Sequence, residues 1–257
     1  MAYYRFETLD QVVTNPHLST GKGGIVKGHM MTLRNNNKIA GTGSQLHFHP
    51  NELIVFSLVG KLNCIVGNDR RIVRPGTVVH MPPYARHSIM ATEDGDVSYL
   101  YLKDNTWDLT GFSADGKNTH GTGAAIQAER DAIVDGLDTC FYPMIDGLDA
   151  PAASARRVCR VEGQRLAFTF NEAPEGWSED VTAAPREMFA YIIRGEMQTS
   201  VGGEEKAATN GEILHIAKGD AVSLRVTKGP ARWATYEPTA RLEKEIAEQG
   251  AHAPGRA

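Results

Sequence analysis

The chain repeats itself at a fixed spacing, and this internal repeat limits the folds that it can adopt. When the sequence is displaced by 135 positions, four glycines fall on glycines, although only 26 of the 257 residues are glycine. Glycines recur at matched places when two segments need the same turns, because glycine readily adopts backbone conformations that other residues avoid. The matched pairs are Gly41 with Gly176, Gly60 with Gly195, Gly67 with Gly202, Gly76 with Gly211, Glu52 with Glu187 and His80 with His215. The sequence therefore predicts two copies of one fold.

Each copy consists of short segments rich in β-branched and aromatic residues, separated by turn residues. In the first copy these segments include Leu53–Val59 and Val97–Leu102, and in the second they include Met188–Ile193 and Arg232–Tyr236. Many short strands at regular spacing are typical of antiparallel sandwiches and barrels, among which the jelly roll is common. The predicted fold class is therefore all-β.

Three histidines of the first copy have the spacing of a metal site. His47 and His49 are separated by one residue, so in a strand both side chains point to the same face. His87 follows the turn-forming segment Pro82–Arg86, and from another strand it could complete a facial site. Imidazole is a suitable ligand for Zn, Cu, Fe and Ni.

These histidines and the glycines around them resemble the motifs of the cupin superfamily. The first cupin motif, G-x5-H-x-H-x3-4-E-x6-G, is matched by Gly41, His47, His49 and Gly60, with Leu53 in place of the glutamate. The second motif, G-x5-P-x-G-x2-H-x3-N, is matched by Gly76, Pro82 and His87, with Tyr84 and Ala91 in place of the glycine and asparagine. Together with the repeat, the resemblance implies a bicupin, built from two tandem jelly-roll β-barrels.

The repeat and the resemblance divide the chain into four parts. They are an N-terminal cupin with the metal site (1–105), a linker (106–157), a C-terminal cupin without one (158–240), and a C-terminal helix and tail (241–257). The ligand positions of the second copy hold Thr182, Ala184, Met188 and Val222, which do not form a metal-ligand set. One metal ion per chain is therefore expected. Helices are predicted over Ala124–Val134 and over Arg241–Gln249, the latter ending at Gly250.

Glu52 stands beside the position where cupins usually carry a glutamate ligand. One step along a strand reverses the direction of the side chain, so Leu53 rather than Glu52 is predicted to line the pocket. Glu187 repeats Glu52 in the copy without histidine ligands, which favours a structural or interface role for both. The same interpretation is given to His80 and its counterpart His215. A β-bulge that turns Glu52 inward is the alternative.

The sequence does not identify the general acid or base, and the candidates are Glu52, Tyr84 and Tyr99. The residues predicted to contact the substrate are Gln45, Leu53, Arg86 and Tyr101. Gln45 has the same parity as His47, and Arg86 could hold a carboxylate in a bidentate fork. The alternatives are a buried amide for Gln45, a solvent-exposed arginine for Arg86, and core packing for the tyrosines.

The composition gives no electrostatic reason to expect nucleic acid or an anionic membrane as a partner. Hydrophobic residues make up 41% and charged residues 23%, and the net charge is -4. Arg5, Glu7 and Asp10 argue against a signal peptide at the N-terminus. The three cysteines form no close-spaced pair, which indicates a reducing, cytoplasmic setting. The expected partner is a small anionic molecule, with a homodimer left open.

Three neutral imidazoles would leave the charge of a divalent metal uncompensated, which favours an anionic, chelating substrate. Three facial ligands also leave positions for substrate and O2, and the resemblance implies dioxygenases with three histidines and no acid. The leading hypothesis is an Fe(II) dioxygenase that cleaves a C–C bond of a catecholic, phenolic-acid or diketone substrate. The first alternative is a non-redox lyase, isomerase, cyclase or hydrolase that uses Zn, Mn or Ni as a Lewis acid. The second is a cupin that binds a small metabolite without turnover.

Overall fold

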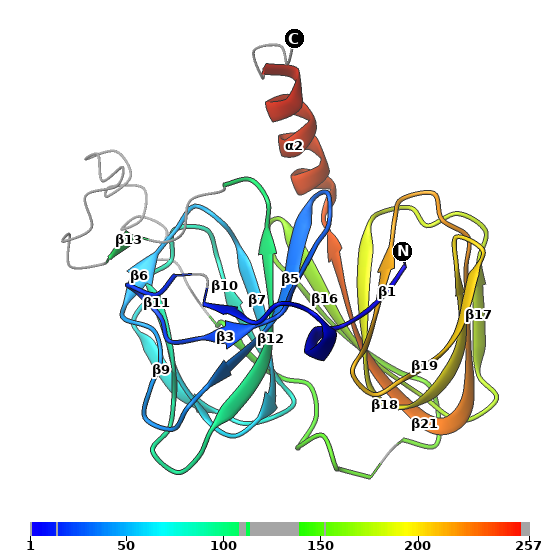
Figure 1. The fold of residues 1–257 in the computed structure, drawn as a ribbon, viewed down its shortest axis with the longest axis horizontal. Helices are drawn as coiled ribbons and strands as arrows, with labels where there is room; N and C mark the ends of the chain where they lie inside the picture. Colours follow the sequence, from blue (N-terminus) through cyan, green and yellow to red (C-terminus); the bar gives the residue numbers. More distant parts are fainter. Residues whose placement is uncertain (1, 14, 108–111, 114–138, 152, 253–257) are drawn as a thin grey trace. The chain divides into compact units, whose positions relative to one another are not determined.

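The computed structural model describes residues 2–13, 15–107, 112–113, 139–151 and 153–252, most of which lie in or between β-strands (Figure 1). The predicted all-β class is confirmed. The chain forms two compact units that alternate along the sequence. We call Leu9–Ile25 with Thr32–Leu148 the N-terminal unit, and Met1–Thr8 with Val26–Met31 and Asp149–Ala257 the C-terminal unit.

The N-terminal unit is built from two antiparallel sheets. Its strands are β2 (Val12–Val13), β3 (Lys22–Gly23), β5 (Met31–Lys38), β6 (His47–Phe48), β7 (Leu53–Val59), β8 (Leu62–Val66), β9 (Asp69–Val73), β10 (Thr77–Met81), β11 (His87–Ala91), β12 (Val97–Asp104), β13 (Phe112–Ser113) and β14 (Phe141–Pro143). The strand orders are β14-β10-β7-β12-β5-β3-β2 and β13-β6-β11-β8-β9. The short strand β4 (Ile25–Lys27) lies where the chain passes from one unit to the other.

The core of the N-terminal unit lies between these two sheets. Leu53 and Val55 of β7 pack in one cluster with Leu62 and Cys64 of β8 and with Ile89 of β11. Alternate residues of a strand point to opposite faces, so the buried residues Glu52, Ile54 and Phe56 have the other parity. Side chains at odd-numbered positions of β7, such as Leu53 and Val55, therefore point into the interior of this unit.

The C-terminal unit contains one sheet with two long, bent strands. Its elements are β1 (Tyr3–Arg5), the short 3-10 helix η1 (Phe6–Thr8), β15 (Arg157–Glu162), β16 (Leu166–Ala173), β17 (Ser178–Val181), β18 (Met188–Val201), β19 (Glu204–Thr209), β20 (Glu212–Ile216), β21 (Val222–Pro238) and α2 (Ala240–His252). The sheet order is β1-β20-β18-β21-β16-β15. The register between β18 and β21 shifts between Ile192 and Met197, and such irregularities let one strand bend through a barrel corner.

The repeat predicted from sequence recurs in the strands and turns. Strands β5, β7 and β10 begin at Met31, Leu53 and Thr77, and β16, β18 and β20 begin 135 positions later. All eight glycines of the four matched pairs have positive φ, between 57° at Gly202 and 89° at Gly76. This is the backbone conformation that explains why glycine is retained in both copies.

The contact-defined units differ from the boundaries expected from sequence. Strand β1 pairs with β20, with Tyr3 opposite Leu214, so the first residues belong to the C-terminal unit. Strand β14, within the expected linker, pairs with β10 of the N-terminal unit, with Phe141 opposite Val79. Both differences arise from pairing between distant segments, which local sequence patterns do not reveal.

The C-terminal helix is present but longer than predicted. It begins at Ala240 and continues past Gly250 to His252. The hydroxyl of Thr239 accepts a hydrogen bond from the Leu242 amide, which caps the helix start. The second predicted helix, Ala124–Val134, lies outside the described residues.

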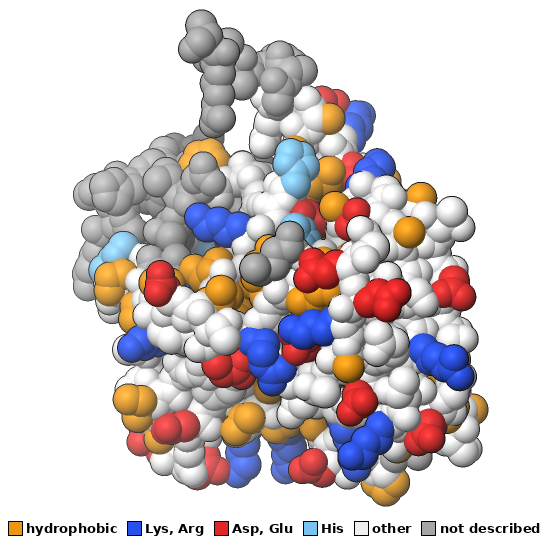
Figure 2. Space-filling model, turned by 45° about the vertical axis from the view of Figure 1, so that its right-hand side comes forward, with side chains coloured by type: hydrophobic (Ala, Val, Ile, Leu, Met, Phe, Trp, Pro, Cys, Tyr) orange, Lys and Arg blue, Asp and Glu red, His pale blue; other side chains and the backbone are white. Residues whose placement is uncertain are grey.

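No helix in the described part of the chain is long and apolar enough to cross a membrane. Acidic and basic side chains are interspersed over the face drawn in Figure 2. The small net negative charge is therefore not gathered into one patch on that face.

Candidate metal centre

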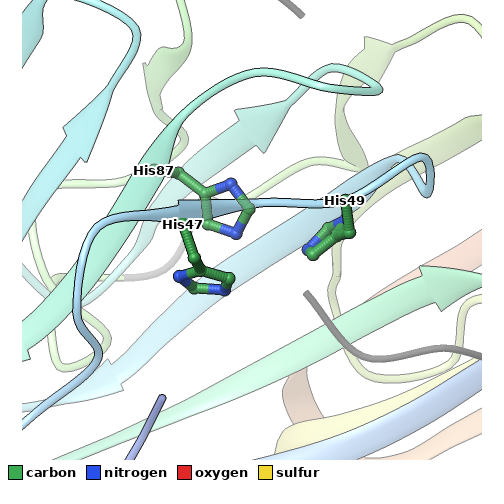
Figure 3. Close-up of side chains that lie close together, drawn as sticks. All are labelled: His47, His49 and His87. Carbon is green, nitrogen blue, oxygen red and sulfur yellow. The ribbon is translucent and has the colours of Figure 1, made fainter. Parts of the chain in front are cut away.

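The three histidines of the cupin motifs come together in the N-terminal unit. His47 lies in β6 directly opposite His87 in β11, and His49 follows β6 by one residue. Their ring centroids are 4.3 Å apart for His47 and His87 and 4.7 Å apart for His49 and His87. One ring nitrogen from each lies within 4.8 Å of the others, and Figure 3 shows the three rings gathered together.

Each histidine ring is oriented by a hydrogen bond to a nearby backbone carbonyl. The Nδ1 atoms of His47, His49 and His87 lie 2.8, 3.0 and 2.8 Å from the carbonyl oxygens of Gln45, Asn51 and Ala85. A carbonyl oxygen only accepts, so Nδ1 carries the proton and donates it. Each neutral ring then keeps the lone pair on Nε2, as in protein sites where histidine binds a metal.

The electrostatic setting keeps these rings neutral. Burial is the main cause that lowers the pKa of His47 to about 4 and that of His49 to about 3. Burial and the neighbouring rings lower the pKa of His87 as well. The Nε2 atom of His49 is buried with no hydrogen-bond partner among the described residues. A buried acceptor without a partner is costly, and a bound metal ion would be the partner of the Nε2 lone pair. The three imidazoles therefore fit a divalent metal.

The structure separates Glu52 from Leu53 as strand parity predicts. Leu53 is 1% exposed and packs in the interior cluster. Glu52 is fully buried with the opposite parity, and its carboxylate lies 2.6 Å from Nε2 of His80. The same pair recurs in the C-terminal unit, where Glu187 lies 2.9 Å from His215. The hydrogen bond to His80 favours a structural role for Glu52, and its place among the candidates for general acid or base stays a prediction.

Tyr84 occupies the motif position where cupins have glycine, and it adopts a glycine-like backbone. Its φ is 64°, the one positive φ of a non-glycine residue in the described chain. Its amide donates to the carbonyl of His49 at 2.8 Å, and the amide of Ala85 donates to Pro82. The turn is thus kept despite the missing glycine, at the cost of backbone strain of about 1–3 kcal/mol. This hydrogen bond ties the turn before His87 to the residue that carries another ring of the cluster.

Of two predicted substrate contacts, Gln45 is placed differently from expectation, whereas the contact expected of Arg86 stays a prediction. Gln45 is exposed, because β6 begins only at His47 and the strand parity does not extend back to it. Its backbone carbonyl, rather than its side chain, serves the site by orienting His47. Arg86 is half-buried, and its Nε has no hydrogen-bond partner among the described residues.

Tyr99 and Tyr101 share a face of β12 and pack with the interior cluster. Tyr99 is 2% exposed, and burial raises its pKa well above the usual value. Burial also raises the pKa of Tyr101 to about 12. Both phenols therefore stay protonated at neutral pH, which makes Tyr99 a poor general base.

Sequence reasoning missed a group of polar residues on β5. Arg34, Asn36 and Lys38 have the same parity, are all buried, and reach the two tyrosines of β12. The Lys38 ammonium lies 5.6 Å from the Tyr99 ring centre, and the Arg34 guanidinium lies 5.9 Å from that of Tyr101. Burial lowers the pKa of Lys38 to about 7. The available signal was the repeat, which aligns Met31–Lys38 with the strand Leu166–Ala173.

The positions equivalent to the histidines in the C-terminal unit are apolar or exposed. Ala184 and Val222 lie in its interior cluster, and Met188 packs against that cluster. Thr182 is exposed. This interior therefore offers no counterpart of the three imidazoles.

Comparisons with known proteins agree with this architecture. A family model described as a cupin domain matches residues 39–103. Oxalate decarboxylase of Bacillus subtilis, in a structure concerned with its Mn(II) centres, has a TM-score of 0.67 at 13% identity, over 92% of this chain and 77% of that one. AerE from Microcystis aeruginosa has a TM-score of 0.65 at 13% identity, over 91% of this chain and 99% of that one. No curated protein matches the sequence.

The segment that matches the cupin-domain model, residues 39–103, contains all three clustered histidines. The similar structures extend the likeness in fold to nearly the whole chain. The fold is thus the one that the sequence motifs implied, while the match to the cupin family model covers residues 39–103.

Proposed function

We propose that the N-terminal cupin is the catalytic part of a metal-dependent enzyme. His47, His49 and His87 would hold one divalent ion through their Nε2 atoms. Two observations carry this proposal. One ring nitrogen of each histidine lies within 4.8 Å of the others, and three Nδ1 hydrogen bonds to backbone carbonyls leave each neutral ring a lone pair on Nε2. A bound divalent metal would supply Lewis acidity, and Fe(II) would also supply electron transfer to O2.

The residues around the cluster favour a small anionic, chelating substrate. The three imidazoles carry no charge, and the buried cation Lys38 acts electrostatically on His47 and His87. Tyr99 and Leu53 pack in the apolar cluster of the same interior. Such an environment stabilises an anion more strongly than water-exposed positions do.

Within this class, we propose an Fe(II) dioxygenase that cleaves a C–C bond of a catecholic, phenolic-acid or diketone substrate. A ligand set without a carboxylate supports it, because the substrate then brings the negative charge. The oxalate decarboxylase structures of similar fold concern a protein with Mn(II), so metal identity is the deciding measurement.

The test is metal analysis of protein purified without oxygen, followed by O2 uptake with catechols, gentisate-like phenols and 1,3-diketones. Iron at one per chain with substrate-dependent O2 uptake is the expected result. Bound Mn, Zn or Ni without O2 uptake would replace the dioxygenase by a Lewis-acid enzyme. A chain that binds no divalent metal would overturn the enzyme proposal as a whole.

A further inference from the structure

Lys38 is a buried amine inside the N-terminal unit, and an anion bound beside it would favour its charged, ammonium form. Its side chain comes from the last residue of β5, is 4% exposed, and crosses to the other sheet, where its ammonium donates to the Ile89 carbonyl at 2.6 Å. Ile89 lies two residues after His87 on β11, so the two side chains share a face. Lys38 is close enough to His47 and His87 to lower the pKa of both.

The Ile89 carbonyl does not need this lysine. The same oxygen accepts the Ser44 amide at 2.9 Å and the Ser44 hydroxyl at 3.1 Å. A carbonyl oxygen has two lone pairs, which Ser44 alone satisfies. An ammonium has three N–H groups, so the contact with Ile89 leaves donors of Lys38 for a further acceptor.

The repeat gives independent evidence that the fold does not need a lysine here. Strands β5 and β16 correspond at an offset of 135, and Lys38 falls on Ala173. Ala173 is fully buried in the interior cluster of the C-terminal unit. The lysine thus belongs with the three histidines, as a polar group present only in the copy with the candidate metal centre.

Among the residues that the structure describes, no carboxylate lies within ion-pair distance of Lys38. Two neighbouring side chains affect the pKa of Lys38 electrostatically, and one of them is the cation Arg34. The other is Cys64, and burial raises the pKa of its thiol to about 12, so it is neutral. A metal ion on three neutral imidazoles adds further positive charge. Buried charge of one sign is costly unless an anion accompanies it.

We propose that Lys38 binds a second anionic group of the substrate, so that the substrate is a dianion with a carboxylate or comparable group beyond its metal-chelating atoms. This inference rests on the proposed metal centre and narrows the substrate class that the centre accepts. The dianion balances the buried positive charge in two places, at the metal and at the ammonium.

The test compares 2-oxo acids that share a chelating head but differ at the far end. Oxaloacetate, 2-oxoglutarate and 2-oxoadipate carry a distal carboxylate at increasing reach, and 2-oxobutanoate, 2-oxopentanoate and 2-oxohexanoate end in a methyl group. Binding to the Mn(II)-loaded full chain is measured by titration calorimetry. At least one dicarboxylate should bind about 10- to 100-fold more tightly than its methyl-terminated partner, as expected for a charge-assisted hydrogen bond.

Lys38→Met should abolish that preference while Mn(II) content stays equal and the unfolding midpoint does not fall. Lys38→Arg should keep a preference, because it keeps the cation. Lys61→Met removes an exposed lysine of the same unit, which pairs with Asp94, and should leave the preference unchanged. No preference in the wild type, or one that survives Lys38→Met, overturns this inference alone. A wild-type chain that takes up no metal overturns the proposed function instead.

Discussion

The two copies keep the same buried pair on one strand face and differ on the other. In the N-terminal unit Glu52 is hydrogen-bonded to His80, and in the C-terminal unit Glu187 is hydrogen-bonded to His215 at the equivalent positions. The interior of the N-terminal unit holds three imidazoles and the amine of Lys38. Among their counterparts in the C-terminal unit, Ala184, Val222 and Ala173 are apolar. Residues retained in both copies therefore serve the fold, and residues present in one copy are the candidates for chemistry.

The Glu187 pair shows how such a structural group is stabilised. Burial disfavours its charged form, but His215 and the backbone amides of Met30 and His29 donate to the carboxylate and hold its pKa below the ordinary value. The carboxylate thus fixes the segment Val26–Met31 within the C-terminal unit. A residue of this kind is buried, charged and paired without touching a substrate.

The largest effect is expected when histidines of the first copy are replaced by the residues at the equivalent positions of the second. His49→Ala and His87→Val introduce the side chains found at Ala184 and Val222, and each removes one of three ligands. We expect the affinity for a divalent metal to fall more than about 100-fold, beyond the loss seen when only a residue supporting a ligand is changed. Competitive titration with a chromogenic chelator measures it.

Exposed His17 provides the matched control, because His17→Ala removes an imidazole far from the motifs in sequence and should not change metal affinity. Full metal occupancy in His49→Ala, or two metal ions per wild-type chain, would show that the ligands are not these three residues.

A smaller effect should be the same in both copies. Glu52→Gln and Glu187→Gln keep the shape of the side chain but replace a charged acceptor by a neutral amide. Each variant should lower the free energy of unfolding by about 1–3 kcal/mol. Metal content should stay at the wild-type value in both. Urea denaturation and metal analysis of the two variants test this symmetry, and loss of metal in Glu52→Gln alone would make Glu52 a ligand.

An effect of similar size distinguishes the copies by pH. An unfolded histidine has a pKa of about 6.5, whereas the folded pKa of His49 is lowered to about 3. Below pH 6.5 the unfolded state therefore binds a proton at His49 that the folded state does not bind. The free energy of unfolding is consequently reduced from its value at pH 7 as the pH falls. For His49 the loss is roughly 2 kcal/mol at pH 5.

Urea denaturation of the metal-free chain at both pH values measures this loss, and His49→Gln should reduce it. Equal losses in the variant and the wild type would mean that His49 is not held neutral. Ala184, the equivalent residue of the C-terminal unit, contributes no such dependence.

Much of this architecture was readable from sequence because it depends on local rules. Paired glycines marked the turns, strand parity separated Leu53 from Glu52, and motif spacing brought His47 together with His87. The same parity rule failed at Gln45, which precedes the strand. The turn at Tyr84 could not be anticipated, since its backbone is imposed by its surroundings.

Lys38 was missed although the repeat could have revealed it. The segment Arg165–Phe170 has the residues of a strand, and the offset places its counterpart across the start of β5. The polar run Arg34–Lys38 concealed this strand, because polar residues facing an interior are rare unless the site uses them. The interleaving of the units could not be read either, since it depends on pairing between residues far apart in sequence.

The placement of β1 has a consequence for how the chain is made. Arg5 bonds to Glu212, 207 positions later, so the first strand has no partner until the last third of the chain has been synthesised. At about 5–20 residues per second, strand β1 waits roughly 10–40 s on the ribosome for its partner. During that interval Tyr3–Arg5 is an unpaired edge segment exposed to chaperones and to other chains. The C-terminal unit therefore closes only after synthesis has passed β20, and contacts of such long range make its folding slow.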